Sequence, residues 1–345
     1  MSNSESRQIV VNIRTLAANL TGVQRYAGSI LELLSDKVVL VQPKPNSCGG
    51  VRGHVWEQTS LPFQTGGRLL WSPGNTGPLA VEKQVVSIMD ASALDHPEWF
   101  SANFAAWYRF IIPRIARRAR KVITISEFSR TRLVETCGID PGKIAVTPLG
   151  YSDAFHPATP GAIADVGVRY KLPGRYVVYV GSIEPRKNLA RLVEAWTRLG
   201  DVKCALVMVG VQARIFSDLN MPECSRRILQ LGRVPDRDLP ALYSGALFLA
   251  YPSLYEGFGL PPLEAMACGC PAIVSHATSL PEVCGEAALY FNPESVDDIV
   301  EKLAVALSDE SLREDLRKKT LQRANQFSWG RCADETLRIL SEAND

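Results

Sequence analysis

Residues 246–267, ALFLAYPSLYEGFGLPPLEAMA, place an apolar strand, a loop with two glycines and a helix start in direct succession. The prolines at 261 and 262 suit a first helical turn, where a missing backbone N–H removes no hydrogen bond. The same alternation recurs through the second half, where strands are predicted at 175–181, 204–210, 227–234, 246–253, 271–275 and 287–291. Short strands alternating with helices predict a parallel sheet that is covered on both faces.

The first half alternates in a similar way. Strands are predicted at 9–13, 37–41, 68–72, 84–90 and 121–126, and helices at 22–34, 103–118 and 127–137. The stretch 151–173 has prolines and glycines but few periodic apolar residues, which indicates a linker between domains. We therefore expect an α/β protein with domains at 1–160 and 161–328, followed by a helix at 329–345 that docks through its apolar positions.

Composition narrows the class of protein. The 345 residues are 46% hydrophobic and 21% charged, as in a globular protein with a sizeable core, and the net charge of +2 does not favour nucleic acid as a partner. No apolar run reaches the ~18 residues that span a bilayer, and the first residues, MSNSESRQ, are polar. We therefore expect a cytoplasmic protein. The eight cysteines lack zinc-like spacing and are expected to be structural.

The loop after the strand at 246–253 has side chains suited to ligand binding. Open α/β folds bind ligands at the carboxyl ends of their strands. Gly257 and Gly259 let the backbone approach a ligand closely, and the free N–H groups of a helix start favour a phosphate. Glu256 in the loop and Glu264 on the helix can accept hydrogen bonds from sugar hydroxyls. The alternative is a glycine turn with two solvated glutamates.

A second strand-to-helix loop, GSIEPRKN at 181–188, carries two cations. Arg186 can hold phosphate oxygens bidentately and Lys187 adds a compact charge, which suits a diphosphate. Asn188 is expected to cap the following helix. The alternative is a solvated charged loop.

These two motifs, EGFGLPPLEA at 256–265 and GSIEPRKN at 181–188, resemble glycosyltransferase family 4, whose members are retaining enzymes of the GT-B architecture. The resemblance covers nearly the whole chain. It implies an N-terminal acceptor-binding domain and a C-terminal nucleotide-sugar-binding domain, both Rossmann-like and facing each other across a cleft. It also implies that the last helix returns to the N-terminal domain.

The resemblance also assigns roles to residues. It implies that Glu256 contacts hydroxyls of the donor sugar, that Glu264 contacts the ribose, and that Arg186 and Lys187 neutralise the diphosphate. The backbone of Phe258 and its neighbours would contact sugar and phosphate, and the segment 231–234 would lie beside the base. The remaining donor contacts are expected at Gly22, Val23, Ser126, Gly181, Arg233, Val234, Gly257, Gly259 and Leu260.

The N-terminal half is similar to a subgroup of that family, the bacterial polysaccharide and O-antigen mannosyltransferase-like enzymes. The similarity rests on TGVQRY at 21–26, WEQ at 56–58, SPGN at 72–75, HPEW at 96–99 and TISEFS at 124–129. Two positions depart from it: Met89-Asp90 replaces a usual His-Asp pair, and Asn12-Ile13-Arg14 replaces Asp-x-Arg. Asp90 remains a candidate catalytic or acceptor residue, and His96 and Tyr26 are further acceptor candidates.

The expected reaction is transfer of a hexose, mannose from GDP-mannose, to a growing and lipid-linked polysaccharide such as O-antigen. The resemblance implies retention at the anomeric carbon, and we expect neither a cofactor nor a metal. Donors with glucose, rhamnose or fucose remain alternatives, and so does a catalytically impaired binding or scaffold protein. A nucleotide-dependent oxidoreductase is disfavoured because no G-x-G-x-x-G follows a strand.

One further stretch, residues 107–121, mixes basic and apolar side chains. A basic amphipathic helix can lie on an anionic membrane surface, which would suit a lipid-linked acceptor. The alternative is a solvated helix face, and Pro113 is expected to interrupt the helix. The sequence therefore leaves peripheral membrane contact open.

Overall fold

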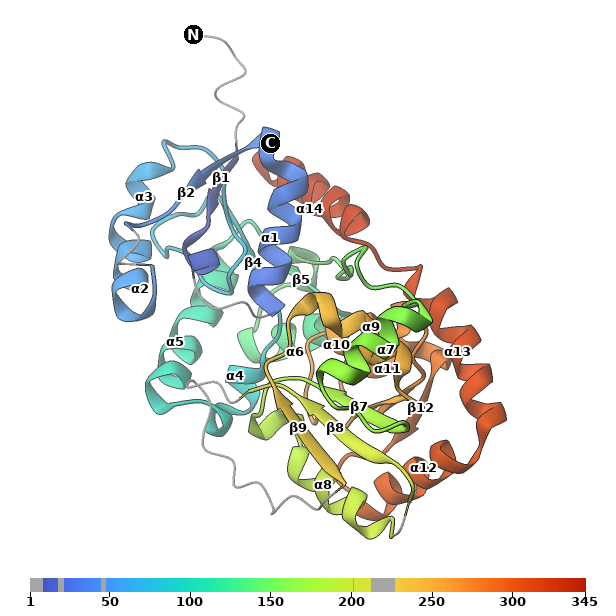
Figure 1. Cartoon of the computed structure of the whole chain (residues 1–345). Helices are drawn as coiled ribbons and strands as arrows, with labels where there is room; N and C mark the ends of the chain where they lie inside the picture. Colours follow the sequence, from blue (N-terminus) through green and yellow to red (C-terminus); the bar gives the residue numbers. More distant parts are fainter. Residues whose placement is uncertain (1–8, 18–21, 45–47, 201, 212–226) are drawn as a thin grey trace. The chain divides into compact units, whose positions relative to one another are not determined.

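The structure is a computed structural model that describes residues 9–17, 22–44, 48–200, 202–211 and 227–345 (Figure 1). The chain divides into two compact units. The first comprises residues 1–97, 102–150 and 328–345, and the second comprises residues 98–101 and 151–327.

The first unit is built on a parallel sheet whose described strands follow the order β2-β1-β3-β4-β5-β6. All five strands expected in this half are present, and β6 is an additional strand. The strands are β1 Ile9–Asn12, β2 Val38–Val41, β3 Leu70–Ser72, β4 Gln84–Ser87, β5 Lys121–Thr124 and β6 Ile144–Val146. The helices are α1 Gly22–Leu34, α2 Gly50–Thr59, α3 Leu61–Gln64, α4 Ser92–Asp95, α5 Ala102–Arg118, α6 Glu127–Cys137 and α14 Trp329–Asn344.

Helix α5 continues through Pro113, so the expected interruption is wrong. Ile111, Ile112 and Ile115 are buried on the same helix. The first two join a core cluster with Val122 of β5. Burial of this apolar stripe stabilises the helix and compensates for the backbone hydrogen bond that is lost at the proline.

The second unit has a parallel sheet in the order β9-β8-β7-β10-β11-β12, as in dinucleotide-binding folds. All six expected strands are confirmed. They are β7 Tyr176–Val180, β8 Ala205–Val209, β9 Ile228–Gly232, β10 Leu249–Tyr251, β11 Ala272–Ser275 and β12 Ala288–Phe291. The order reverses between β7 and β10, because successive strands are added on opposite sides of β7. Such a reversal opens a crevice at the carboxyl ends of the two strands.

Helices cover both faces of this sheet: α8 packs against α12, while α9 packs against α7 and α10. Right-handed crossovers place α8 and α9 on opposite faces, because they lie on either side of the reversal. The helices are α7 Pro160–Arg169, α8 Leu189–Arg198, α9 Leu239–Gly245, α10 Leu260–Ala267, α11 Leu280–Cys284, α12 Val296–Ser308 and α13 Glu310–Ala324.

The stretch 151–173 is not a plain linker as expected, because it contains α7. Thr159 caps this helix by accepting a hydrogen bond from the Ala162 N–H, at 3.3 Å, and Pro160 occupies its first turn. Apart from residues 98–101, the second unit starts at Tyr151, ten residues before the expected boundary at 161. Phe155 explains part of this difference, since its ring packs on Tyr243 of α9.

The last helix, α14, belongs to the first unit and packs against α1 (Figure 1). Ile339 and Leu340 on its inner face are buried. Arg120 donates a hydrogen bond to the carbonyl of Ala343 at 2.6 Å, which ties the end of this helix to the start of β5. The C-terminal segment therefore completes the N-terminal unit.

We expect Gly210→Ala to destabilise the second unit. Gly210 directly follows β8, with φ +146°, and a Cβ there would lie 1.7 Å from the Gly181 carbonyl oxygen. Relief requires movement of backbone, so the unfolding free energy should fall by about 3 kcal/mol. Urea unfolding would measure the change. Gly174→Ala is the control because its Cβ would meet no atom within 4 Å, and equal losses for both variants would contradict the prediction.

Candidate functional site

The candidate site lies where the strand order of the second unit reverses. The loop after β7 carries Arg186 and Lys187, and the loop after β10 carries Glu256. Because β7 and β10 are hydrogen-bonded neighbours, their carboxyl ends bring these two loops together. The topology thus assembles residues that are about seventy positions apart in the sequence.

The backbone after β7 turns sharply before α8. A short 3-10 helix, Pro185–Lys187, is followed by Asn188 in the left-handed conformation, with φ +57°. The Asn188 side chain does not cap α8, so that expectation is wrong. Its amide instead donates to the carbonyls of Pro252 and Pro293, at 3.1 and 2.7 Å. Asn188 therefore ties this loop to the loops that follow β10 and β12.

Lys187 and Glu256 form a buried ion pair. The Lys187 Nζ lies 2.6 Å from Glu256 Oε1 and donates a second hydrogen bond to the Tyr251 hydroxyl, at 2.9 Å. Tyr251, the last residue of β10, donates to the same carboxylate oxygen at 2.8 Å. Lys187 and Glu256 are only 5% and 6% exposed. The three polar groups thus satisfy one another away from water.

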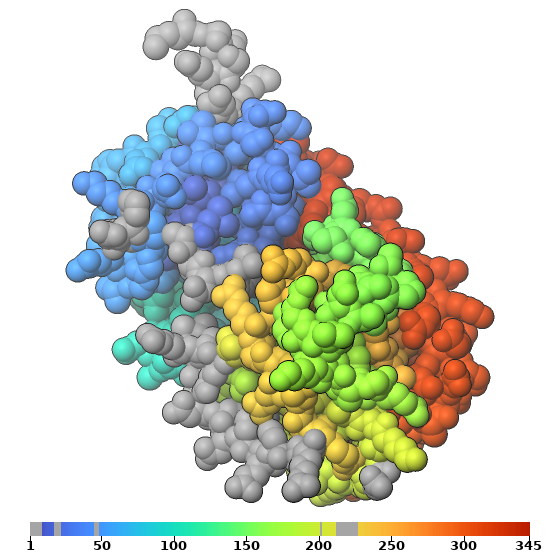
Figure 2. Space-filling view, viewed as in Figure 1, coloured from blue at the N-terminus to red at the C-terminus, as the bar shows by residue number. Residues whose placement is uncertain are grey.

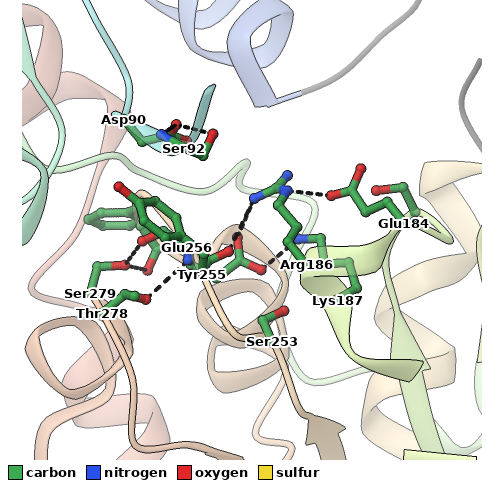
Figure 3. Close-up of polar contacts among 12 residues, drawn as sticks. Asp90, Ser92, Glu184, Arg186, Lys187, Ser253, Tyr255, Glu256, Thr278 and Ser279 are labelled. Carbon is green, nitrogen blue, oxygen red and sulfur yellow. Dashed lines mark hydrogen bonds and ion pairs between the residues drawn. The ribbon is translucent and has the colours of Figure 1, made fainter. Parts of the chain in front are cut away.

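Arg186 links two carboxylates. Its Nε lies 2.5 Å from Glu184 Oε1, and its guanidinium donates to Glu256 Oε2 at 3.4 Å (Figure 3). It also donates to the Tyr255 carbonyl at 3.3 Å. The Arg186 side chain is 19% exposed, compared with 7% for Lys187. Arg186 is therefore the more accessible of the two cations.

These contacts set the protonation states. Burial alone would raise the pKa of Glu256, but the adjacent Lys187 and Arg186 charges lower it to about 2. Burial lowers the pKa of Lys187, and the positive charge of Arg186 acts in the same direction, whereas Glu256 opposes both. The Glu256 carboxylate is consequently ionised throughout the physiological range.

The loop 256–260 leads directly into α10. Gly259 precedes this helix with φ +109°, a conformation that side chains rarely adopt, and a Cβ would meet Leu280 at 2.7 Å. Leu260 is the first helical residue. Glu264, one turn further on, is 4% exposed. The two glutamates of the motif thus occupy the loop and the helix, as the sequence predicts.

The other donor candidates of this unit differ in exposure. Arg233 follows β9 and is exposed, whereas Val234 is buried. Gly181 follows β7, and its N–H donates to the Val209 carbonyl at 2.9 Å. Phe258 is buried and its ring packs edge-on against Phe327, while Gly257 is also buried.

The candidates of the first unit follow its strands. Gly22 and Val23 begin α1, while Thr21 of the same motif lies outside the described residues. Asp90 accepts hydrogen bonds from the Ser92 N–H and hydroxyl, at 2.9 and 2.6 Å, at the start of α4. His96 ends that helix, and its N–H donates to the Ser92 carbonyl at 2.8 Å.

Two candidates of the first unit, Tyr26 and Ser126, have buried side chains with intramolecular partners. Tyr26 is fully buried, and its hydroxyl hydrogen bonds with Ser87 at 3.0 Å while its ring packs edge-on against Trp71. Ser126 is also fully buried, and its hydroxyl caps α6 by accepting from the Ser129 N–H at 3.0 Å. In this structure Tyr26 therefore contributes to the core of the first unit and Ser126 to the start of α6.

A buried polar network lies at the carboxyl edge of the first sheet and is formed by Asn12, Arg14 and Glu57. Glu57 is fully buried and accepts from the Asn12 amide at 2.8 Å and from Arg14 Nε at 3.4 Å. Thr76 donates to its other oxygen at 2.9 Å. Burial would raise the pKa of Glu57, but a hydrogen bond from His54 and the charge of Arg14 lower it. This network fixes α2 to the sheet.

Sequence reasoning missed Tyr251, Thr278 and Ser279. Tyr251 ends an apolar strand and has the pattern of a core residue. The Glu256 N–H donates to the Thr278 hydroxyl at 3.0 Å. The Ser279 hydroxyl lies 2.9 Å from the carbonyls of both Glu256 and Phe258 (Figure 3). No sequence motif predicts a role for these hydroxyls, because they form hydrogen bonds with backbone groups of a different loop.

Solved structures share this fold. The protein HepE from Anabaena, crystallised with UDP and glucose, superposes with a TM-score of 0.77 over 97% of this chain and 99% of that chain, at 16% identity. The architecture is therefore that of the GT-B glycosyltransferases.

Sequence comparison gives the family. A family model described as "Glycosyl transferases group 1" matches residues 169–323. The O-antigen chain mannosyltransferase B of Escherichia coli is 35% identical over 268 residues, which cover 75% of this chain and 70% of that protein. This chain belongs to the group 1 glycosyltransferases. It also matches the serotype-specific mannosyltransferase WbdA of Escherichia coli at 32% identity, over 67% of this chain but only 30% of that protein.

Membrane-spanning helices were also sought. Within the described ranges, no helix combines the length and the apolar character required to cross a bilayer.

We expect the ion pair to make stability depend on pH. Glu256→Gln leaves Lys187 buried beside a neutral side chain and should cost about 3 kcal/mol at pH 7. The folded-state pKa of Glu256 is depressed from 4.5 to about 2, so its contribution is complete above pH 4.5 and is lost as the pH falls towards 2. Urea unfolding of the wild type and Glu256→Gln should show a smaller difference in unfolding free energy at pH 3 than at pH 7.

Glu335→Gln is the control, because Glu335 pairs with Arg338 on the exposed face of α14. This change should have little effect at either pH. A difference between wild type and Glu256→Gln that stays constant from pH 7 to pH 3 would show that the carboxylate is not paired as the structure places it.

Proposed function

We propose that this glycosyltransferase transfers mannose from GDP-mannose to a growing, lipid-linked polysaccharide of the O-antigen type, with retention at the anomeric carbon. One observation carries the donor site: two cations and a buried carboxylate converge at the strand reversal of the second unit. The choice of mannose is supported by the names of the relatives, O-antigen chain mannosyltransferase B and mannosyltransferase WbdA.

Charge compensation is the main task of the site. As the bond between the anomeric carbon and the β-phosphate oxygen breaks, negative charge builds on the departing nucleoside diphosphate. Arg186, being the more exposed cation, binds the diphosphate oxygens, while Lys187 is held between Glu256 and that charge. The N–H groups at the start of α10 add to this stabilisation. We propose that these groups act without a metal or cofactor.

Glu256 positions the sugar. Its carboxylate is ionised and fixed on both oxygens, so it can accept hydrogen bonds from the sugar hydroxyls without reorganising. In the proposed step the acceptor hydroxyl oxygen bonds to the anomeric carbon on the face that the phosphate leaves, and its proton passes to the departing phosphate oxygen. Glu264 would hold the ribose. The sugar therefore needs no amino-acid nucleophile.

Acceptor binding is assigned to the first unit. Asp90 and His96 flank α4, and neither is fully buried. Met89 occupies the position where the resemblance implies a histidine, and its thioether has no ionisable proton, so it contributes no proton-transfer group. We therefore place acceptor contacts at Asp90 and His96.

A membrane-facing surface would suit a lipid-linked acceptor. Helices α2 and α3 lie on the surface of the first unit (Figure 2), and they expose Val51, Val55 and Phe63 to 80%, 54% and 88%. Between residues 48 and 81 the one acidic residue is Glu57, which is buried, and Arg52 is exposed. Apolar side chains with positive and no negative charge around them favour an anionic lipid surface.

Helix α5 also combines exposed apolar and basic side chains. Arg114 lies 3.9 Å over the ring of Phe110, which is 44% exposed, and Phe110 stacks with Trp107. Trp107 in turn contacts His54 of α2, which joins the two helices. No acidic residue occurs between 99 and 126. We propose that this surface gives peripheral contact with the cytoplasmic face of the membrane.

Two alternative functions can be distinguished by experiment. HepE was crystallised with UDP and glucose, so a UDP-glucose donor is the first alternative, with rhamnosyl and fucosyl donors beside it. A catalytically impaired binding or scaffold protein is the second, suggested by Met89. It would bind a nucleotide or partner without turnover.

The function is tested by a donor screen. Purified protein with GDP-mannose and a mannose-containing acceptor should release GDP and form a longer saccharide, detected by mass spectrometry, and EDTA should not lower the rate. Arg186→Ala should lower kcat by about 100-fold, because it removes one stabilising group for the leaving charge. Arg198→Ala is the control, since this arginine lies exposed on α8.

The outcomes separate the alternatives. Turnover with UDP-glucose alone would replace the donor, whereas nucleotide binding without turnover by any donor would favour the scaffold. A folded protein that neither binds nor turns over any nucleotide sugar would refute the donor site.

Membrane contact is tested with vesicles of anionic phospholipid. The double variant Val51→Ser/Phe63→Ser should sediment with them at least about tenfold more weakly, because it removes two side chains able to bury apolar area. Added salt should weaken binding of the wild type. Val168→Ser is the matched control, since Val168 is 81% exposed on α7 of the second unit. Equal binding by all three proteins would refute the proposed surface.

A further inference from the structure

Thr278 has an unfavourable backbone conformation beside the candidate site. It follows β11, with φ +54°, and the next residue, Ser279, has φ −83° and ψ −9°. The Leu280 N–H donates to the Ala277 carbonyl at 3.2 Å and closes the turn. These are the φ signs of a type II′ turn, in which glycine dominates the first central position. A β-branched residue is strained there.

The other described residues with positive φ outside glycine are easier to explain. Asn75 and Asn188 are asparagines, which tolerate this conformation, and Lys171 lies just beyond the C-terminal end of α7 with its side chain exposed. Thr278 is the one β-branched residue among the four. Strain of this kind persists where the surrounding structure requires it, and it often marks functional sites.

The hydroxyl of Thr278 supplies what glycine would lack. Its Oγ1 accepts the hydrogen bond of the Glu256 N–H at 3.0 Å. The Ser279 hydroxyl, next in sequence, lies 2.9 Å from the Glu256 carbonyl oxygen and donates to it. Glu256 is 6% exposed, so water does not readily replace these partners. One turn therefore holds both peptide groups of Glu256.

The side chain of Glu256 is fixed independently, by Lys187 and Tyr251 from the other direction. Figure 3 shows Thr278 and Ser279 on one side of Glu256 and the two cations on the other. The backbone contacts set where the Glu256 Cα lies, and the cations set where its carboxylate points. A shift of the backbone would displace the carboxylate relative to a bound sugar.

We propose that Thr278 is a positioning residue for sugar transfer: its strained turn directs a hydroxyl at the Glu256 backbone and so fixes the carboxylate that orients the transferred sugar. This proposal rests on the proposed function of Glu256. Thr278 acts on the sugar end of the site through Glu256, while the diphosphate is held by Arg186 and Lys187. Loss of its hydroxyl should therefore affect transfer more than nucleotide binding.

Thr278→Gly separates positioning from folding. Glycine relieves the strain but leaves the buried Glu256 N–H without its partner, so the two effects oppose each other and the thermal unfolding midpoint should stay close to that of the wild type. The hydroxyl is lost, so kcat should fall on the order of 10- to 100-fold. The Kd for GDP, measured by calorimetry, should stay within about twofold of the wild type, because the diphosphate end is untouched. A merely structural role predicts an unchanged kcat, which would overturn the proposal.

Lys171→Gly is the matched control. Lys171 has φ +51° and lies at the exposed end of α7, so glycine should relieve strain there and leave kcat unchanged. A fall in kcat for this variant as large as for Thr278→Gly would also overturn the proposal, since relief of strain alone would then account for the loss.

Conservative variants complete the test. Thr278→Ser keeps the hydroxyl and should retain wild-type kcat within a few-fold. Thr278→Val keeps the shape without the hydroxyl and should behave like Thr278→Gly. Equal kcat for the Ser and Val variants would refute the role of the hydroxyl. A folded wild type without turnover on any nucleotide sugar would instead overturn the proposed function, and this inference with it.

Discussion

The buried ion pair between Lys187 and Glu256 is the constraint on which the second unit's site depends. Two charges lose their hydration when buried, and only good geometry with further hydrogen bonds compensates that loss. The 2.6 Å contact, the Tyr251 hydroxyl and the guanidinium of Arg186 supply this compensation. The pair cannot form unless β7 and β10 are adjacent. The electrostatics of the site therefore depend on the strand reversal.

Pre-organisation follows from this pairing. The carboxylate and both cations are in place without a ligand, so a nucleotide sugar bound at the proposed donor site would not have to gather charges from solvent. Arg186 is held by Glu184 as well as by Glu256, which keeps its planar group oriented despite its partial exposure. An arginine oriented by two carboxylates binds phosphate with less loss of side-chain freedom than a free one.

The sequence predicts those features that depend on local pattern. Alternating apolar strands and helices were sufficient for the sheets, and the spacing of Arg186, Lys187 and Glu256 after strands was sufficient for their convergence. Thr278 could not be found, because its role depends on a turn conformation that threonine disfavours. The resemblance implies ligand contacts for Tyr26 and Ser126, and nothing in the sequence indicates that tertiary packing directs both side chains into the interior. Motif position indicates proximity to a site but does not give side-chain direction.

Position 89, where the resemblance implies a histidine and this chain has methionine, can be understood in the same terms. The Met89 N–H donates to the side chain of Asn75 at 2.8 Å, and Asn75 is held in turn by the Ser87 carbonyl at 3.0 Å. The backbone before Asp90 is thus fixed by Asn75, whatever side chain residue 89 carries. The methionine side chain is buried, where an imidazole would need polar partners and a thioether does not. The backbone that leads to Asp90 is therefore held in place without a histidine at position 89, so the position of the Asp90 carboxylate does not depend on an imidazole beside it.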